Sequence, residues 1–121
     1  MDESRPIFQQ IAELIENDII AGALPEATQV PSTNEFAAFH RINPATAGKG
    51  VNLLVDEGIL YKKRGIGMFV APGARDRLIA ARRDRFSAQY ITPLLAEAAK
   101  LGIEPEQLAA MITASPKGGA R

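Results

Sequence analysis

The sequence has no cysteine, no tryptophan and a single histidine, His40, in 121 residues. Without cysteine, the chain has no disulfide, no thiol nucleophile and no cysteine ligand for zinc. One histidine also makes a histidine-based metal site or a Ser-His-Asp triad hard to assemble in one chain. Because no other pairing of acid, base and nucleophile stands out, we expect a protein that is not an enzyme and has no cofactor or metal.

Long apolar runs are missing as well. No run approaches the roughly 18 residues that a membrane span requires, and the N-terminal stretch MDESRPIFQQ lacks the apolar region of a secretory signal. These absences predict a cytoplasmic protein with no membrane partner. Hydrophobic residues make up 46% of the chain, which is typical of a folded domain and not of a disordered chain.

Charge is balanced overall but not along the chain. Fourteen basic and fourteen acidic residues give a net charge of zero. Residues 1–60 carry three basic and nine acidic groups (net −6), whereas residues 61–85 carry eight basic and two acidic groups (net +6). Such asymmetry indicates an anionic partner contacted by one segment, although a solvated, arginine-rich helix face gives the same pattern.

Apolar spacing and end signals predict three short helices in the first half. Apolar residues recur every three or four positions over residues 6–21, and Gly22 is placed to end that helix. Ser32-Thr33-Asn34-Glu35 is a capping box that begins a second helix, with Phe36, Ala37 and Phe39 expected to face inward and His40 in the following loop.

The third helix is expected from Asn43, a good N-cap, to Gly58, which fits a left-handed position after the helix. Pro44 suits its first turn. Gly48 and Gly50 weaken it by roughly 1 kcal/mol each relative to alanine. We therefore expect that something holds this helix or approaches it closely.

Short strand-like runs at residues 59–63 and 68–70 flank Arg64-Gly65-Ile66-Gly67, which predicts a β-hairpin. A helical pattern then covers residues 74–101, with Pro93 expected to kink or split it, and a last helix begins near residue 104. The expected organisation is a domain at 1–73, a helical region at 74–114 and a flexible tail at 115–121.

Three helices followed by a hairpin is the element order of a winged helix-turn-helix, so the predicted fold class is mainly α with a small β-hairpin. In such proteins the third helix enters the DNA major groove, and the residues of its first turn meet the base edges. Asn43, Ala45 and Thr46 offer small or hydrogen-bonding groups there, and Lys49 follows one turn later. The cations and glycines of residues 62–67 suit a wing against the DNA backbone.

Five blocks in order resemble the DNA-binding domain of GntR-type transcriptional regulators, and the Asn-Pro-x-Thr helix start with a short C-terminal part resembles the YtrA-like subgroup. The blocks cover residues 6–11, 30–37, 42–46, 53–61 and 64–70. The resemblance implies a homodimeric regulator, usually a repressor, that binds double-stranded DNA and dimerises through its C-terminal helices. It leaves open a small-molecule effector. The sequence departs from the family where Asn34 and Gly48 stand in place of arginines.

Taken together, residues and resemblance predict two sets of site residues. The DNA-binding set is Ser32, Thr33, Asn34, Arg41, Asn43, Ala45, Thr46, Lys49, Lys63, Arg64, Gly65 and Gly67. The dimerisation set is apolar and lies in the C-terminal helices, because an uncovered apolar stripe costs about 25 cal/mol per Å². Its members are Phe86, Tyr90, Ile91, Leu94, Leu95, Leu108, Met111 and Ile112.

A second interpretation is a winged-helix module that binds a protein and no DNA. The replaced arginines at Asn34 and Gly48 and the zero net charge favour it. Lys62 and Lys63 also have an alternative role, since lysines protect exposed strand edges from aggregation. The main prediction remains a dimeric, sequence-specific DNA-binding regulator acting on a roughly palindromic operator.

Overall fold

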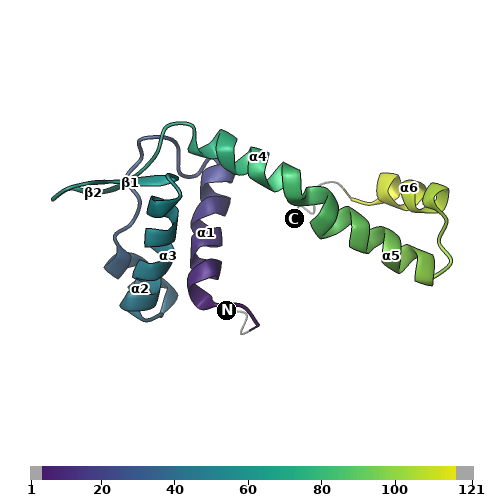
Figure 1. Cartoon of the computed structure of the whole chain (residues 1–121), viewed down its shortest axis with the longest axis horizontal. Coiled ribbons are helices and arrows are strands. Elements are labelled where there is room, and N and C mark those ends of the chain that lie inside the picture. Colours follow the sequence, from purple (N-terminus) through teal and green to yellow (C-terminus); the bar gives the residue numbers. More distant parts are fainter. Residues whose placement is uncertain (1–3, 117–121) are drawn as a thin grey trace. The chain divides into compact units, whose positions relative to one another are not determined.

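The structure is a computed structural model that describes residues 4–116 (Figure 1). The chain divides into two compact units, Met1–Ala80 and Ala81–Arg121. The first unit contains helices α1 (Ile7–Ala21), α2 (Thr33–His40) and α3 (Pro44–Asp56), strands β1 (Leu60–Lys63) and β2 (Gly67–Val70), and the start of α4 (Ala74–Phe86). The predicted winged helix-turn-helix is confirmed, and the arrangement is that of the expected fold class.

The core of the first unit lies between α1 and α3, with α2 packed on α3 and the hairpin at their end. Ile11, Ile15 and Ile19 line the buried side of α1, and Val51 and Leu54 face them from α3. Gly50 explains how the helices come so close. A Cβ on Gly50 would lie 2.7 Å from the carbonyl oxygen of Phe8, so the expected close approach to α3 is confirmed.

The end signals of the helices behave as predicted. The Ser32 hydroxyl accepts from the Glu35 backbone N–H at 3.1 Å, and the Glu35 carboxylate accepts from the Ser32 N–H at 2.9 Å. Asn43 caps α3 by accepting from the Ala45 N–H at 2.7 Å. Gly22 and Gly58 both adopt the left-handed conformation, with φ of 87° and 76°.

Two expectations for α2 are wrong. Phe39 is 82% exposed, not buried, because the inward face of this eight-residue helix is centred between Phe36 and Ala37, and Phe39 lies well to one side of it. His40 is the last residue of α2 and not a loop residue. It is half-buried, with its ring centroid 4.3 Å from that of Phe36.

The hairpin pairs Leu60 with Val70 and Lys63 with Gly67 in antiparallel register. The connector after α1, expected only to be extended, adds a short third segment to this sheet. Gln29 forms a bridge with Phe69, and the Val30 N–H donates to the Met68 carbonyl at 2.9 Å. The hairpin is therefore supported along one edge by a segment about forty residues earlier in the chain.

The boundary between the units lies between residues 80 and 81, later than the predicted boundary after residue 73. Ala74 and Leu78 belong to the first unit's core. Arg77 donates to the Gly58 carbonyl just after α3, and Arg75 donates to the Ile20 carbonyl at 2.9 Å. The first turns of α4 are thus part of the first unit.

The second unit consists of the end of α4, a π-helical turn η1 (Ser87–Ile91), α5 (Thr92–Lys100) and α6 (Pro105–Ala114). The interruption expected at Pro93 takes the form of this widened turn and not of a break, because Ile91 and Thr92 keep helical backbone angles. Of the predicted tail, Ser115 and Pro116 follow α6, and residues 117–121 lie outside the described part of the chain.

Candidate DNA-binding surface

The first turn of α3 presents short side chains at the surface. Asn43 and Ala45 are exposed, and Thr46 is half-buried. The Asn43 side-chain oxygen is engaged by the Ala45 N–H, so its amide group is held in one place at the start of the helix. Small side chains here let the helix backbone approach a groove of base edges closely.

Gly48 faces α2 and not the core. A Cβ at this position would lie 3.5 Å from the Thr33 methyl group, which is an ordinary packing distance. Thr33 is half-buried against this face, whereas Ser32 and Asn34 are exposed at the start of α2. The start of α2 therefore packs against the second turn of α3.

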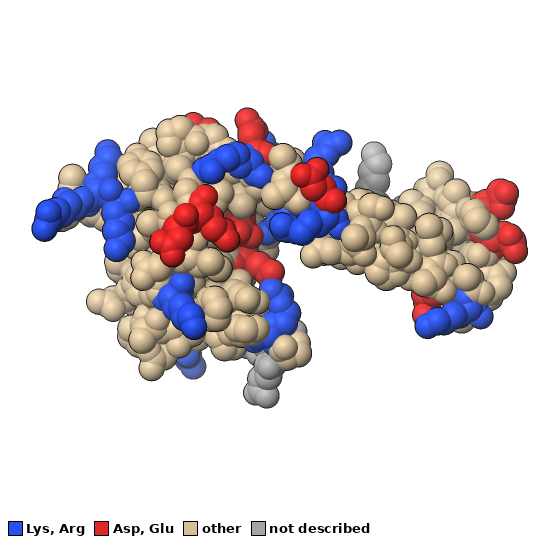
Figure 2. Space-filling model, viewed as in Figure 1, with Lys and Arg blue, Asp and Glu red and all other residues tan. Residues whose placement is uncertain are grey.

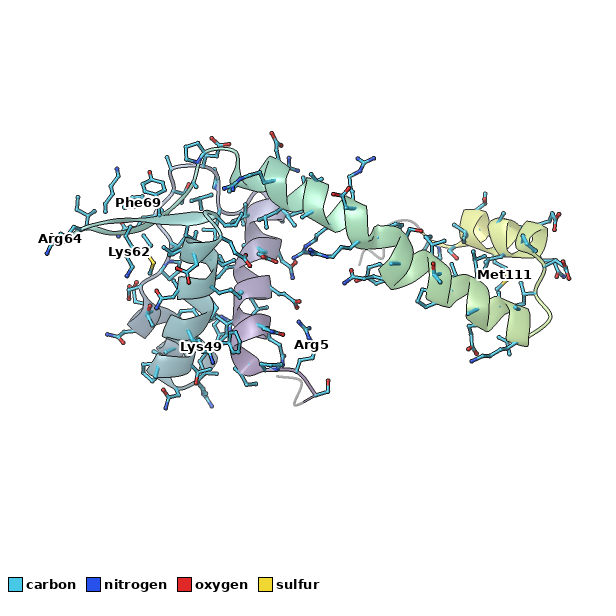
Figure 3. All side chains as sticks on the ribbon, in the orientation of Figure 1. Arg5, Lys49, Lys62, Arg64, Phe69 and Met111 are labelled. Atoms are coloured by element: carbon cyan, nitrogen blue, oxygen red, sulfur yellow. The ribbon has the colours of Figure 1, made fainter. Side chains whose placement is uncertain are left out.

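Lys49 is exposed on α3, and its ammonium group lies over the Phe8 ring, 4.3 Å from the ring centroid. This cation–π contact directs the lysine toward the first turns of α1 (Figure 3). The surrounding groove is lined by Phe8, Ala45, Gly48, Lys49, Asn52, Leu53 and Asp56. No local pattern indicates Phe8 as a partner of Lys49, because the contact joins residues that are distant in the chain.

The tip of the hairpin carries the clearest positive patch of the first unit. Lys62, Lys63 and Arg64 are exposed, and Figure 2 shows their cations gathered at the end of the β1–β2 hairpin. The turn is closed by the Ile66 N–H, which donates to the Lys63 carbonyl at 2.9 Å, and Gly65 supplies the positive φ of 76°. This is a compact wing with cations beside glycine.

The two faces of the hairpin differ. Lys63 lies over the Phe69 ring, with its ammonium group 4.7 Å from the centroid, and Phe69 stacks on Tyr61 at 5.8 Å. Leu60 and Val70, paired on the other face, are buried in the core. The face with Leu60 and Val70 thus packs on the core, and the opposite face holds Lys63 over the Phe69 ring, which stacks on Tyr61.

The predicted DNA-binding residues are therefore gathered on one unit but in separate groups. Those of α2 and α3 lie at the starts of adjacent helices, and those of the wing lie at the hairpin tip, where Figure 3 places Arg64 away from Lys49. Arg41 is exposed at the end of α2, with a left-handed φ of 57°. Two cations of the basic segment 61–85, Arg75 and Arg77, donate hydrogen bonds to backbone carbonyls of their own chain. Part of the positive charge of this segment therefore stabilises the fold.

The predicted dimerisation residues lie in the second unit, where most are exposed. Phe86, Tyr90, Met111 and Ile112 are each more than half exposed, and Leu94 and Leu95 are 38% and 47% exposed. Ile91 is half-buried. Leu108 differs, because it is 8% exposed within its own chain, where α5 and α6 pack together. It therefore has little surface left to offer a partner.

The described residues 4–116 contain no group of three or more His, Cys, Asp or Glu side chains that could hold a metal ion. None of the helices in this same range is long and apolar enough to cross a membrane.

A helix-turn-helix with an exposed recognition-helix start and a cationic wing defines a class, the winged helix-turn-helix DNA-binding proteins. Within that class, the profile of the bacterial regulatory proteins of the gntR family matches residues 7–70. The chain therefore belongs to the GntR family of DNA-binding transcriptional regulators.

The relatives support this assignment over nearly the whole chain. The sequence is 29% identical to the HTH-type transcriptional repressor YtrA of Bacillus subtilis, over 96% of this chain and 91% of YtrA. Its fold matches a GntR family transcriptional regulator from Listeria monocytogenes with a TM-score of 0.76 and 27% identity, covering 96% of this chain and 100% of that one. These relatives are named as regulators and not as enzymes.

Several matching structures include operator DNA. The DNA-binding domain of AraR in complex with operator ORX1 matches with a TM-score of 0.54 and 30% identity, covering 59% of this chain and 87% of the AraR chain. DNA-binding domains of this family thus bind operators through the fold that the first unit adopts.

Proposed function

We propose that the protein is a transcriptional repressor that binds a roughly palindromic operator as a homodimer. The observation that carries the proposal is the pairing, on one unit, of an exposed α3 start with a cationic hairpin tip. The first can read base edges and the second can contact phosphates. The similarity to YtrA, which is named a repressor, favours repression over activation.

The Thr46 and Lys49 side chains are the proposed base-reading groups of α3. Asn34 and Gly48 provide no cation, so more of the affinity for the DNA backbone falls to Lys63 and Arg64. Each phosphate that a cation neutralises contributes about −0.9 to the slope of log K against log salt concentration. A chain of zero net charge is expected to bind non-specific DNA weakly.

Dimerisation through the second unit is supported by its uncovered apolar side chains. Among its described residues only Ala98 and Leu108 are buried. The large apolar side chains left exposed are Phe86, Tyr90, Leu94, Leu95, Leu101, Met111 and Ile112. Exposed apolar surface of this kind marks an interaction site. A two-fold dimer would present two α3 helices to major grooves about 34 Å apart, which matches a palindromic site.

Selection of binding sites from a random duplex library tests the proposal directly. The full chain is expected to enrich a palindromic sequence and to bind it about a thousandfold or more tightly than a scrambled duplex of the same composition. Equal affinity for both duplexes would overturn sequence-specific binding and favour the protein-interaction module. Enrichment of a single, non-repeated half-site would overturn the dimer.

Matched substitutions separate the two proposed roles. Thr46→Val keeps the shape of the side chain and removes its hydroxyl, so it is expected to weaken the selected duplex about tenfold and leave the scrambled duplex unchanged. Arg64→Ala is expected to weaken both duplexes and to reduce the steepness of the salt dependence by about one unit. Fluorescence anisotropy across a salt series measures both effects.

We extend the proposal to release of the operator by a small molecule. Compounds handled by the products of neighbouring genes are the candidates, and the expected result is dissociation of the operator complex on their addition.

A further inference from the structure

We propose that Gln29 is a positioning residue for the DNA-binding wing. Its side-chain amide holds the hairpin turn so that Lys63 and Arg64 are ordered before DNA arrives. The proposal rests on the proposed function, because it assigns the wing a role in DNA binding.

The central contact is a hydrogen bond between distant parts of the chain. The Gln29 Nε2 group donates to the Ile66 carbonyl at 3.0 Å. Ile66 is the residue that closes the hairpin turn, because its own N–H donates to the Lys63 carbonyl at 2.9 Å. The Gln29 side chain therefore holds Ile66, and Ile66 is in turn hydrogen-bonded to the backbone of Lys63.

Gly67 makes room for this side chain. A Cβ on Gly67 would lie 2.5 Å from the Gln29 Nε2 atom and 3.4 Å from Cδ, so a side chain at position 67 would require the Gln29 amide to move away. Gly67 also has a φ of 147°, which side chains rarely adopt. The missing side chain at Gly67 therefore leaves the space that the Gln29 amide occupies.

The backbone of the connector prepares the contact. Gln29 forms a bridge with Phe69, and the adjacent Val30 N–H and Thr28 carbonyl bond to Met68 and Val70. These bonds hold the base and middle of β2, and the Gln29 side chain extends the hold to the turn. A two-stranded hairpin of four residues per strand is marginal by itself, so an added tether has a large effect on its order.

The tether acts next to the residues that are proposed to contact DNA. Arg64 projects from the tip of the hairpin in Figure 3, and Lys62 and Lys63 precede it on β1. A loose tip would have to be ordered when DNA binds, and that ordering weakens affinity. Gln29 itself is exposed, so its loss leaves the hydrophobic core of the unit intact.

The test is a double-mutant cycle in the full chain, using the duplex obtained by selection. Gln29→Ala is expected to weaken binding about fivefold in the wild-type background, and less than about twofold when Arg64→Ala is already present. Gln9→Ala, at an exposed glutamine of α1, is the control and is expected to leave binding unchanged. An equal loss of affinity in both backgrounds would overturn the assignment of Gln29 as acting through Arg64.

Hydrogen exchange of the free protein gives a second readout, independent of DNA. The Ile66 amide is expected to exchange faster in Gln29→Ala, and also in Gln29→Glu, which keeps the size of the side chain but cannot donate to the Ile66 carbonyl. Unchanged exchange at Ile66 in both variants would overturn the proposal. If Arg64→Ala binds DNA as tightly as the wild type, the wing's role in the proposed function fails, and exchange at Ile66 still decides whether Gln29 orders the turn.

Discussion

Two glycines of α3, Gly48 and Gly50, differ in how much space surrounds them. A Cβ at Gly50 would lie 2.7 Å from the Phe8 carbonyl oxygen and 2.9 Å from a methyl carbon of Ile11, whereas a Cβ at Gly48 would meet only the Thr33 methyl at 3.5 Å. Gly50→Ala is therefore expected to destabilise the protein by about 1–2 kcal/mol, the cost of overpacking less the gain in helix propensity.

Gly48→Ala is the matched control, with an expected gain in stability of up to about 1 kcal/mol from helix propensity alone. Urea denaturation followed by circular dichroism measures both changes. Equal effects of the two substitutions would contradict the close approach of α1 and α3.

Ala27 has a backbone conformation that favours glycine. Its φ of 65° is left-handed, a region that costs a non-glycine residue about 1–2 kcal/mol. Ala27→Gly is expected to stabilise the protein by about 0.5–1 kcal/mol, because relief of strain exceeds the added flexibility of glycine. Ala23→Gly, in the same connector but without a positive φ, is expected to destabilise by a similar amount. A lower denaturation midpoint for Ala27→Gly would contradict the left-handed turn.

At the scale of the elements, the start of α3 combines an N-cap with the proposed contact to DNA, and one position can separate the two. Asn43→Asp keeps an N-cap of equal quality, so stability is expected to be unchanged, while its new carboxylate repels phosphates and weakens DNA binding about tenfold. Asn43→Ala is expected to lose about 1 kcal/mol of stability. Thermal denaturation measures the stability of each variant, and fluorescence anisotropy measures its DNA binding. Undiminished DNA binding by Asn43→Asp would contradict the proposed contact of the α3 start with the duplex.

The elements that the sequence predicted well are those with local signals. The capping box at Ser32, the Asn43 cap and the glycine-rich turn before Gly67 depend on residues only a few positions apart. Long-range contacts were not predictable in the same way. The pairing of Gln29 with Phe69 and the ties of Arg75 and Arg77 to the first unit join residues that carry no shared pattern.

In the candidate site, too, local features were predictable and long-range contacts were not. The exposed start of α3 and the cationic wing were predicted from residue types and element order. The contact of Lys49 with Phe8 and the burial of Leu108 could not be predicted, because each depends on the packing of a second helix. The inward assignment of Phe39 failed because packing on α3 centres the buried side of α2 between Phe36 and Ala37, and Phe39 lies to one side of it.

At the scale of the whole molecule, the proposed function requires a dimer built on the second unit. Leu94 is 38% exposed and lies among the apolar side chains of the proposed interface. Leu94→Glu is expected to convert the protein to a monomer in analytical ultracentrifugation, because a charge cannot be buried in such an interface without a partner. It is also expected to weaken operator binding about a hundredfold through loss of the two-site advantage.

Glu106→Lys, an exposed charge change in the same unit, is the control and is expected to leave the dimer intact. A wild-type protein that sediments as a monomer at micromolar concentration would contradict the dimer, whatever the behaviour of Leu94→Glu.

The most direct measurement of the central claim is an NMR titration of the isotope-labelled full chain with the selected duplex. The largest amide shifts are expected in residues 43–49 at the start of α3 and in residues 63–67 of the wing, with little change along the second half of α1. Shifts confined to α5 and α6, or the absence of any shift at saturating duplex, would contradict the central claim.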